Sequence, residues 1–329
     1  MKGVFMSLAK KFQKQKMMHH VLLALIPVLL MSIYLFGWRV LLLLAVVTVA
    51  GVLSEYAIMY LINKEKTKVT EAVFVSCTLF VLTLPPTVPI WMAVIGIVFG
   101  IVFGKAAFGG FGQNIFNPAL VARCFLYISF PTHMTMVWTN PFAGFPGGFA
   151  QFTGSADLIT AATPMMSMKE GAVSGLPSLW QIIVGTTSGS LGETSVILIL
   201  IGAAYLLITK TASWKIMAGS LAGAGVLSVV LYLAGVVPTA PHYFLLSGGF
   251  LFATAFMATD PITATRDETA KFIFGAFVGL VAVVIRVFSL FTEGIMFAVL
   301  IGNSFAPLID RQVKAFRAWR KARTKEVAA

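Results

Sequence analysis

Long apolar runs separated by short polar or glycine- and proline-rich stretches dominate the pattern of this sequence. A helix that crosses a bilayer needs about 20 predominantly apolar residues. Windows of this kind, several of them shorter than that length, occur at about 21–37, 39–62, 70–84, 88–104, 117–130, 193–208, 214–234, 242–258, 271–289 and 294–309. The pattern predicts an all-α integral membrane protein with about ten transmembrane helices.

Composition supports a membrane protein and gives its charge a particular meaning. Hydrophobic residues make up 58% of the 329 residues and charged residues 11%, which excludes a soluble domain with a polar coat. The formal net charge is +12. Because the basic residues cluster at both termini and in short gaps between the runs, we interpret them as a topology signal and expect no nucleic-acid partner.

The distribution of lysine and arginine predicts which loops face the cytoplasm. The basic N-terminus, "NKEKTK" (63–68), Lys105, "TKTASWK" (209–215), and Arg266 with Lys271 fall on one side of a ten-span chain. The gaps on the other side are poor in basic residues, and the long segment 131–178 has Lys169 as its only lysine or arginine. The positive-inside rule therefore places both termini in the cytoplasm and segment 131–178 outside.

Two short motifs recur in the same order in the two halves of the chain. "TLPPT" (83–87) and "TDPIT" (259–263) share Thr-x-Pro-x-Thr, and "NIFNP" (114–118) and "NSFAP" (303–307) share Asn-x-Phe-x-Pro. The copies lie five predicted spans apart, so the second half would be inverted relative to the first. We expect a 5+5 inverted repeat with broken helices and these parts: a basic tail 1–20, a repeat 21–130, an outside segment 131–178, a repeat 179–310 and a basic tail 311–329.

Ionisable residues inside apolar segments are costly unless they have partners, so each is a candidate for function or structural pairing. The deepest are Glu55, Arg123, Glu193, Arg286 and Asp310. Two interpretations of Glu193 remain open. It either takes part in a cation path or cofactor pocket, or it simply caps the start of a helix. A structural pair is favoured for Arg123, turn capping for Asp260, and a helix end at the interface for Asp310.

Several longer motifs carry a resemblance to one family. "LPPTVPIWM", "GQNIFNPAL", "GSLGETS", "ATDPITA" and "EGIMFAVLIGNSFAPLID" resemble the large membrane subunit shared by two respiratory complexes. This subunit is RnfD in the Rnf complex and NqrB in the sodium-translocating NADH:quinone reductase. The resemblance runs from about residue 17 to 311. It implies a bacterial inner-membrane protein with a ten-helix inverted repeat, and a covalent FMN joined to a threonine outside by a flavin transferase.

The implied attachment site lies in "DLITAATPM" (157–165). The family pattern runs Asp, two or three residues, Ser or Thr, Gly, Ala, Thr, and Asp157, Thr160, Ala162 and Thr163 match it. Thr163 falls at the acceptor position of the phosphoester. Ala161 replaces the usual glycine and restricts the backbone there, because only glycine enters φ > 0 freely.

Asn114 and Asn117 are candidates for holding a second, non-covalent flavin, riboflavin, at the repeat interface. Their spacing of three predicts two carboxamides on one helical face just ahead of Pro118. A pair of amides can match the donor and acceptor edge of an isoalloxazine ring. The alternative is that both amides satisfy backbone groups freed by Pro118.

The resemblance leaves the complex open. "ISFPTHMT" and the short N-terminus favour the Rnf protein, whereas "VARCFLY", "ASWKI" and "ATDPITA" favour the quinone-reductase protein; length inclines the choice to Rnf. In both, the resemblance implies electrons from partner subunits and coupling to Na⁺ or H⁺ transport, with quinone as a candidate partner. The competing hypotheses are a flavin-free solute channel or transporter and a purely structural anchor of the complex.

Overall fold

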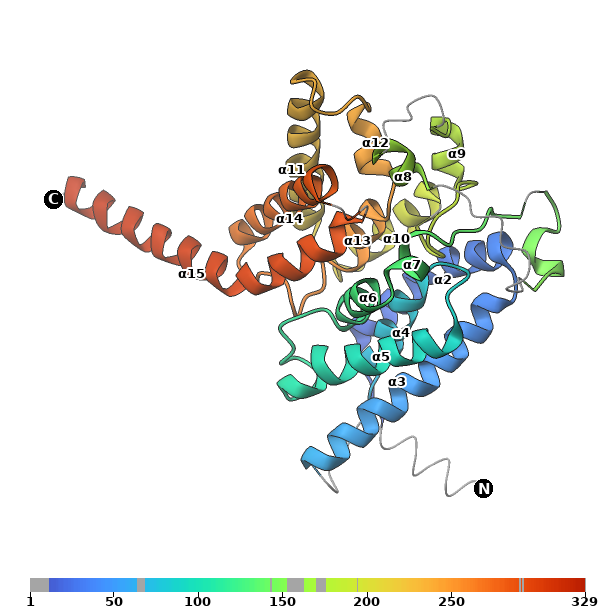
Figure 1. The fold of residues 1–329 in the computed structure, drawn as a ribbon. Coiled ribbons are helices and arrows are strands. Elements are labelled where there is room, and N and C mark those ends of the chain that lie inside the picture. The colour runs from blue at the N-terminus through green and yellow to red at the C-terminus, as the bar shows by residue number, and fades with distance from the viewer. Residues whose placement is uncertain are drawn as a thin grey trace.

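The computed structural model describes residues 12–63, 69–142, 144–152, 163–169, 176–193, 195–289, 291 and 293–328. Within these ranges the chain is mostly helical (Figure 1). Two short parallel strands, β1 (Phe12–Gln13) and β2 (Val69–Thr70), pair with each other. They join the segment before the first long helix to the segment that follows the second.

Six helices in the described ranges are long and apolar enough to cross a membrane. They are α2 (Lys16–Phe36), α3 (Arg39–Asn63), α5 (Ile90–Gly104, extended by the 3-10 turn η2, Ala106–Phe108), α11 (Trp214–Leu233), α14 (Glu268–Phe288) and α15 (Gly294–Ala328). Each begins and ends close to one of the predicted apolar windows, apart from the C-terminal extension of α15. The chain is therefore a multi-pass membrane protein.

The other predicted windows form shorter helices. α4 (Ala72–Leu82), α6 (Pro118–Ser129) and α10 (Val196–Ile208) are apolar but fall short of the length needed to span a bilayer alone. The window 242–258 divides into α12 (Pro241–Leu246) and α13 (Phe250–Phe256), because Gly248 and Gly249 adopt positive φ and end the first helix. The remaining short helices are α7 (Pro131–Thr135), η3 (Gly147–Ala150), α8 (Pro164–Lys169) and α9 (Leu179–Val184).

The helices form two groups that correspond to the two halves of the chain. In the first group α5 packs against α3 and α6, and α4 packs against α2 and α3. In the second group α14 packs against α11 and α15, and α13 packs against α10 and α11. Figure 1 shows the first group in blue to green and the second in yellow to red. The groups meet where α2 contacts α10 and where α6 contacts α15.

Glycine permits the close packing of α11 against α14. A Cβ at Gly223 would lie 2.3 Å from the Ala276 carbonyl oxygen, and one at Gly279 would lie 2.1 Å from the Ser220 carbonyl oxygen. Small residues let helix backbones approach in this way where lipid supplies no hydrophobic driving force. These two helices make the closest helix pair of the second group.

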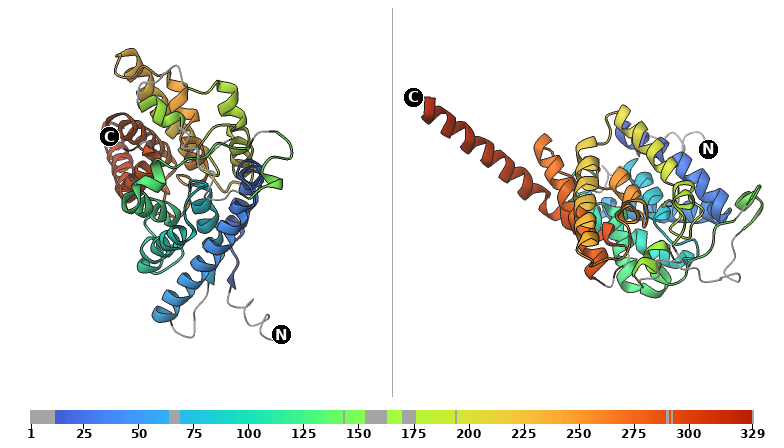
Figure 2. Two further views of the ribbon diagram at one scale, coloured as in Figure 1. Left: turned by 45° about the vertical axis from the view of Figure 1, so that its right-hand side comes forward. Right: turned by 90° about the horizontal axis from the view of Figure 1, so that it is seen from above.

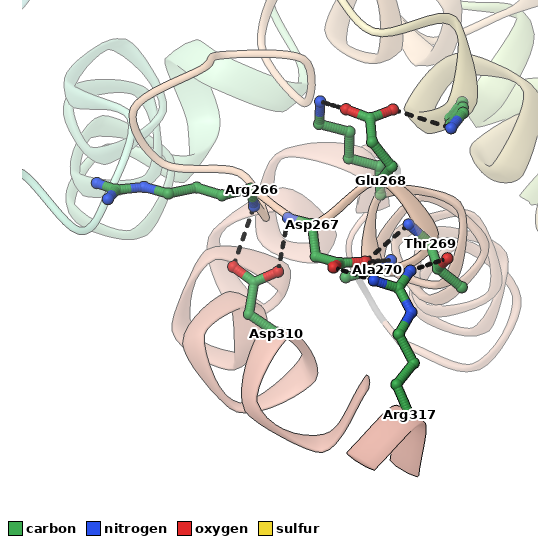
Figure 3. A network of polar contacts seen from close by, with 9 residues as sticks. Arg266, Asp267, Glu268, Thr269, Ala270, Asp310 and Arg317 are labelled. Carbon is green, nitrogen blue, oxygen red and sulfur yellow. Dashed lines mark hydrogen bonds and ion pairs between the residues drawn. The ribbon is translucent and has the colours of Figure 1, made fainter. Parts of the chain in front are cut away.

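The C-terminal part of α15 leaves the body of the protein. Figure 2 shows it standing clear of the other helices. Most of its residues from 311 to 324 are exposed, and many of them are lysine or arginine. Its attachment is an ion pair from Arg317 to Asp267, the N-cap of α14, with an N–O distance of 2.6 Å (Figure 3). Desolvation opposes ionisation of Asp267, but the N–H groups of Thr269 and Ala270 and the Arg317 guanidinium outweigh it and lower the pKa of this carboxyl.

Candidate functional site

Thr163 lies at the start of α8, and its side chain borders a buried cavity. The residue is 9% exposed, and its Oγ accepts a hydrogen bond of 3.3 Å from the Met166 N–H. The cavity, here called the Thr163 cavity, has a volume of about 30 Å³ and is also lined by Ser188, Glu193, Gly248 and Glu293. A space of this size holds about two waters. The predicted acceptor hydroxyl thus faces a small polar cavity that also contains two carboxylates.

The two carboxylates of this cavity are held by one guanidinium. Arg123 of α6 donates to Glu193 Oε1 at 2.8 Å, to Ser190 Oγ at 3.1 Å and to Glu293 Oε2. All three charged side chains are nearly fully buried. We call Arg123, Glu193 and Glu293 the buried charge cluster; it confirms that Arg123 has a charged partner and joins α6 to the segments before α10 and α15.

A second buried arginine binds the backbone of two residues, Ser247 and Gly248, that line the Thr163 cavity. Arg286 of α14 donates to the carbonyl oxygens of Phe244 at 2.5 Å, Ser247 at 3.2 Å and Gly248 at 2.6 Å. These carbonyls lie at the end of α12, where the helix breaks and leaves them without intrahelical partners. Arg286 therefore stabilises the break between α12 and α13.

The position of Glu193 depends on backbone contacts made by the loop that carries it. Leu191 and Gly192 donate their N–H groups to the carbonyls of Leu84 and Leu82, at 3.0 and 2.6 Å. Those carbonyls belong to the end of α4, directly at the first Thr-x-Pro-x-Thr motif. On its other side Glu193 touches Gly249, where a Cβ would lie 2.2 Å from Oε1. The Glu193 carboxylate thus sits between two helix breaks, one from each half of the chain.

Asn114 and Asn117 line a second cavity, but not from a helical face. α6 begins only at Pro118, because a proline disfavours the helical conformation in the residue before it, and Asn117 is extended. The Asn114 amide donates to the Phe116 carbonyl at 3.1 Å, and Asn117 Oδ1 caps the Ala119 N–H at 3.0 Å. The expectation of a shared helical face is wrong. Both amides bond to local backbone groups, and a role in holding a flavin stays a prediction.

This second cavity, here called the Asn114 cavity, has a volume of about 50 Å³. It is lined by Asn114, Asn117 and Lys105 from the first half of the chain and by Thr259, Asp260, Pro261 and Ile262 from the second. The Asn-x-Phe-x-Pro motif of one half therefore faces the Thr-x-Pro-x-Thr motif of the other. In the second half a direct contact joins the same pair of motifs, because Asn303 donates to the Thr263 carbonyl at 3.2 Å.

Lys105 is not the exposed loop charge that the topology argument assumed. It is 2% exposed, and its Nζ donates to Glu55 Oε1 and Oε2 at 2.9 and 2.8 Å and to Thr70 Oγ1 at 2.7 Å. Glu55 is equally buried and so requires this cation. The pair fixes the end of α5 against α3 and β2.

The remaining candidates serve local structure or lie outside the described residues. Asp260 accepts from the Ile262 N–H and the Thr263 hydroxyl, each at 3.1 Å, which confirms turn capping. Asp310 accepts the N–H groups of Arg266 and Asp267 at 3.0 and 3.1 Å. Asp157, Thr160 and Ala162 of the predicted attachment pattern lie outside the described residues.

Sequence reasoning missed Glu293 and Ser190 as members of the site. Glu293 stands at the start of a predicted span, where an acid is ordinary helix capping, and Ser190 lies in a glycine-rich stretch without a distinguishing pattern. A usable signal did exist for Glu293. A chain that buries Arg123 and Arg286 needs carboxylates at a similar depth, and few acids border its apolar windows.

Comparison with known proteins identifies relatives of this chain. Residues 6–317 match the family described as NQR2, RnfD, RnfE. A Na(+)-translocating NADH-quinone reductase subunit from Azotobacter vinelandii is 44% identical over 257 residues, covering 75% of this chain and 61% of that protein. The protein of that name from Chromohalobacter salexigens is 40% identical, covering 79% of this chain and 65% of its own length. The match thus spans less than two thirds of these relatives, but nearly the whole of this chain matches the family: the chain belongs to the NQR2, RnfD, RnfE family.

Proposed function

We propose that this chain is the flavin-carrying membrane subunit of an ion-translocating electron-transport complex, acting only together with other subunits. The chain is a family member with a threonine at the family's acceptor position. The observation that carries the proposal is that this threonine borders a polar cavity between its own segment and the second half of the chain. The names of the relatives support the sodium-translocating quinone reductase, with the Rnf complex as the alternative. Coupling to Na⁺ follows from the same names.

Thr163 is the residue that we propose to hold FMN through a phosphoester. Among the described residues its Oγ accepts one weak hydrogen bond, so it can become an ester oxygen without stranding a buried donor. The Thr163 cavity is too small for an isoalloxazine ring, so the ring must lie beyond it, on the side from which the flavin transferase approaches. When bound, FMN supplies the one- and two-electron chemistry that amino-acid side chains lack.

A non-covalent riboflavin at the Asn114 cavity is the second part of the proposal. Asn114 and Asn117 reach this cavity from one half and the "TDPIT" segment reaches it from the other. Each amide uses only part of its hydrogen-bonding capacity on the backbone, so each retains donors or acceptors for a ligand. The present volume requires these two segments to separate before a ring can enter.

The architecture that we propose for this function is a ten-segment, 5+5 inverted repeat. It is supported by matching contacts, since α3 with α5 and α5 with α6 have their counterparts in α11 with α14 and α14 with α15. The short helix α4 of the first half corresponds to the broken pair α12 and α13 of the second. Each precedes one of the two Thr-x-Pro-x-Thr motifs. Both termini would lie in the cytoplasm of a bacterial inner membrane.

The test of the function is whether the chain itself carries covalent flavin. The full chain is produced together with the family's flavin transferase, purified and run on a denaturing gel under ultraviolet light. A fluorescent band at the chain's mass is expected, because a phosphoester survives denaturation whereas bound riboflavin does not. A dark band from chain that is inserted and folded would favour the solute channel or transporter instead.

A further inference from the structure

The largest of the described cavities lies at the basic end of the second half. It adjoins the Asn114 cavity, with which it shares Thr211, Ala212, Thr259 and Pro261, and it shares no lining residue with the Thr163 cavity. It has a volume of about 590 Å³ and lies between the end of α10, the start of α11, the start of α14 and the first turn of α2. We call it the basic cavity. Its lining includes Lys210, Trp214, Thr265, Arg266 and Lys271.

Cations outnumber anions at the basic cavity. Glu268 is the acid in its lining, and it is shared between Lys271 at 2.5 Å and Lys215 at 2.9 Å (Figure 3). Among the described residues, the side chains of Lys210 and Arg266 have no acidic or hydrogen-bonding partner. Figure 3 shows the Arg266 guanidinium directed away from Asp310, which accepts only its backbone N–H. Two cations thus remain for an external anion.

A buried polar atom in the same wall also lacks a partner. Thr265 is 3% exposed, and its Oγ1 makes no hydrogen bond within the described part of the chain. Buried hydroxyl groups are almost always satisfied, and an exception calls for an absent ligand or water. Thr265 lines the basic cavity together with Lys210 and Arg266, so a ligand in this cavity is a candidate partner for its hydroxyl.

The rest of the cavity suits the junction between headgroups and acyl chains. Met17, Leu207 and Ile216 give it an apolar side, and Trp214, 61% exposed, lies at its mouth. Tryptophan prefers the headgroup level of a bilayer. Below it Ile208 is 80% exposed on the outer surface of α10, where lipid is its natural neighbour.

We propose that the basic cavity binds the phosphate of an anionic phospholipid in the leaflet on the basic side of the protein. A phosphodiester offers the oxygens that Lys210, Arg266 and Thr265 lack, while the acyl chains continue along α10 and past Trp214. Basic pockets between transmembrane helices bind anionic lipid headgroups in this manner. A zwitterionic lipid would bring its own cation into a site that already has an excess of them.

Native mass spectrometry of the full chain in detergent tests the site. Dioleoylphosphatidylglycerol and dioleoylphosphatidylcholine are titrated separately, and the bound fraction is measured at each concentration. Wild type should retain phosphatidylglycerol more tightly than phosphatidylcholine. Lys210→Gln with Arg266→Gln should weaken phosphatidylglycerol binding by about 25-fold, at about fivefold for each charge removed near the membrane surface.

The matched control is Arg320→Gln with Lys321→Gln, which removes the same charges from the exposed part of α15. It should leave the affinity for phosphatidylglycerol unchanged. An equal loss in both double variants, or equal affinity of wild type for the two lipids, would overturn the proposal in favour of diffuse attraction. Displacement of the lipid by millimolar inorganic phosphate would overturn it in favour of a free-anion site.

Discussion

Arg123 shows how one residue can hold the interior of this membrane protein together. Its guanidinium satisfies two carboxylates that come from the segments before α10 and α15, and all three groups are almost entirely withdrawn from solvent. Burying one charge without a partner costs several kcal/mol, so these residues are stable only as a set. Because Glu193 and Glu293 also line the Thr163 cavity, the cluster sets the shape and charge of the proposed flavin site.

Replacing Arg123 tests this interdependence. Arg123→Met keeps much of the length of the side chain but leaves two buried carboxylates unpaired, and should lower the free energy of unfolding by about 3–5 kcal/mol. Thermal or detergent-induced unfolding of the purified chain measures the loss. The triple variant Arg123→Met with Glu193→Gln and Glu293→Gln should recover much of it. A single variant as stable as wild type would mean that the cluster is not a structural unit.

The proposed flavin-binding role of Asn114 and Asn117 can be tested apart from their hydrogen bonds to the local backbone. Asn114→Leu removes one amide, and Asn117→Ser removes the other while keeping an N-cap for α6. Acid extraction of the purified complex should then release little riboflavin, while the covalent FMN remains attached. Asn303→Leu, the corresponding residue of the second half, is the control and should retain riboflavin. Unchanged riboflavin in the Asn114/Asn117 variant would remove both residues from the site.

At the level of elements, the candidate site is formed mainly where helices break, and less by the helices themselves. The apolar window 242–258 reads as one span, yet the chain breaks at Ser247–Gly249 and leaves three carbonyls that Arg286 satisfies. Gly249 adopts φ +66°, and its missing side chain leaves room for the Glu193 carboxylate. The break thus makes room for Arg286 and Glu193 inside the protein, where a continuous helix would exclude them.

Gly249→Ala should therefore disturb both the backbone and the cluster. A left-handed conformation costs an L-residue about 1–2 kcal/mol, and the new Cβ would also displace Glu193. The melting temperature of the purified variant should fall clearly below that of wild type. Gly189→Ala in the neighbouring loop is the control, since its Cβ would meet nothing within 4 Å and its φ is not positive. Equal melting temperatures for the two variants would contradict this account of the break.

The sequence could predict the spans but not how their ends meet. Apolar length located the long helices to within a few residues, apart from the C-terminal extension of α15. It could do so because a helix satisfies its own backbone hydrogen bonds in lipid. The Thr163 cavity, however, is assembled from segments separated by more than a hundred residues, and no local pattern encodes which acid meets Arg123. The assignment of Lys105 to an exposed loop was wrong for the same reason. The sequence around a lysine between two spans does not tell whether its side chain faces water or a buried acid such as Glu55.

At the scale of the whole molecule, the two groups of helices place the candidate sites close to where they meet. The Asn114 cavity takes residues from both halves of the chain, and the Thr163 cavity joins segment 131–178 to the second half. In the proposed topology the Thr163 cavity lies toward the outside and the Asn114 cavity toward the cytoplasm, so a flavin at each would lie along a path across the membrane. The buried charge cluster lies beside this path and joins α6 to the start of α15.

Orientation in the membrane can be tested with single cysteines. Thr132→Cys, at the exposed end of α7, should react with a membrane-impermeant maleimide added to spheroplasts, because the scarcity of basic residues puts this end outside. Thr324→Cys, on the basic part of α15, should react only after the membrane is opened. The unmodified chain corrects for Cys77 and Cys124. The reverse pattern of labelling would invert the topology.

The mass of the chain is the most direct measurement of the central claim that Thr163 carries the flavin. The wild-type chain and Thr163→Ala are each produced with the flavin transferase, and their intact masses and peptide maps are compared. The account predicts that wild type carries one FMN, less the water lost on ester formation, on the peptide that contains Thr163. Thr163→Ala should be inserted equally well and lack the addition, because one hydroxyl is lost and no span is changed. An unmodified wild-type chain, or an adduct that survives in Thr163→Ala or maps to Thr160 or Thr194, would contradict the account.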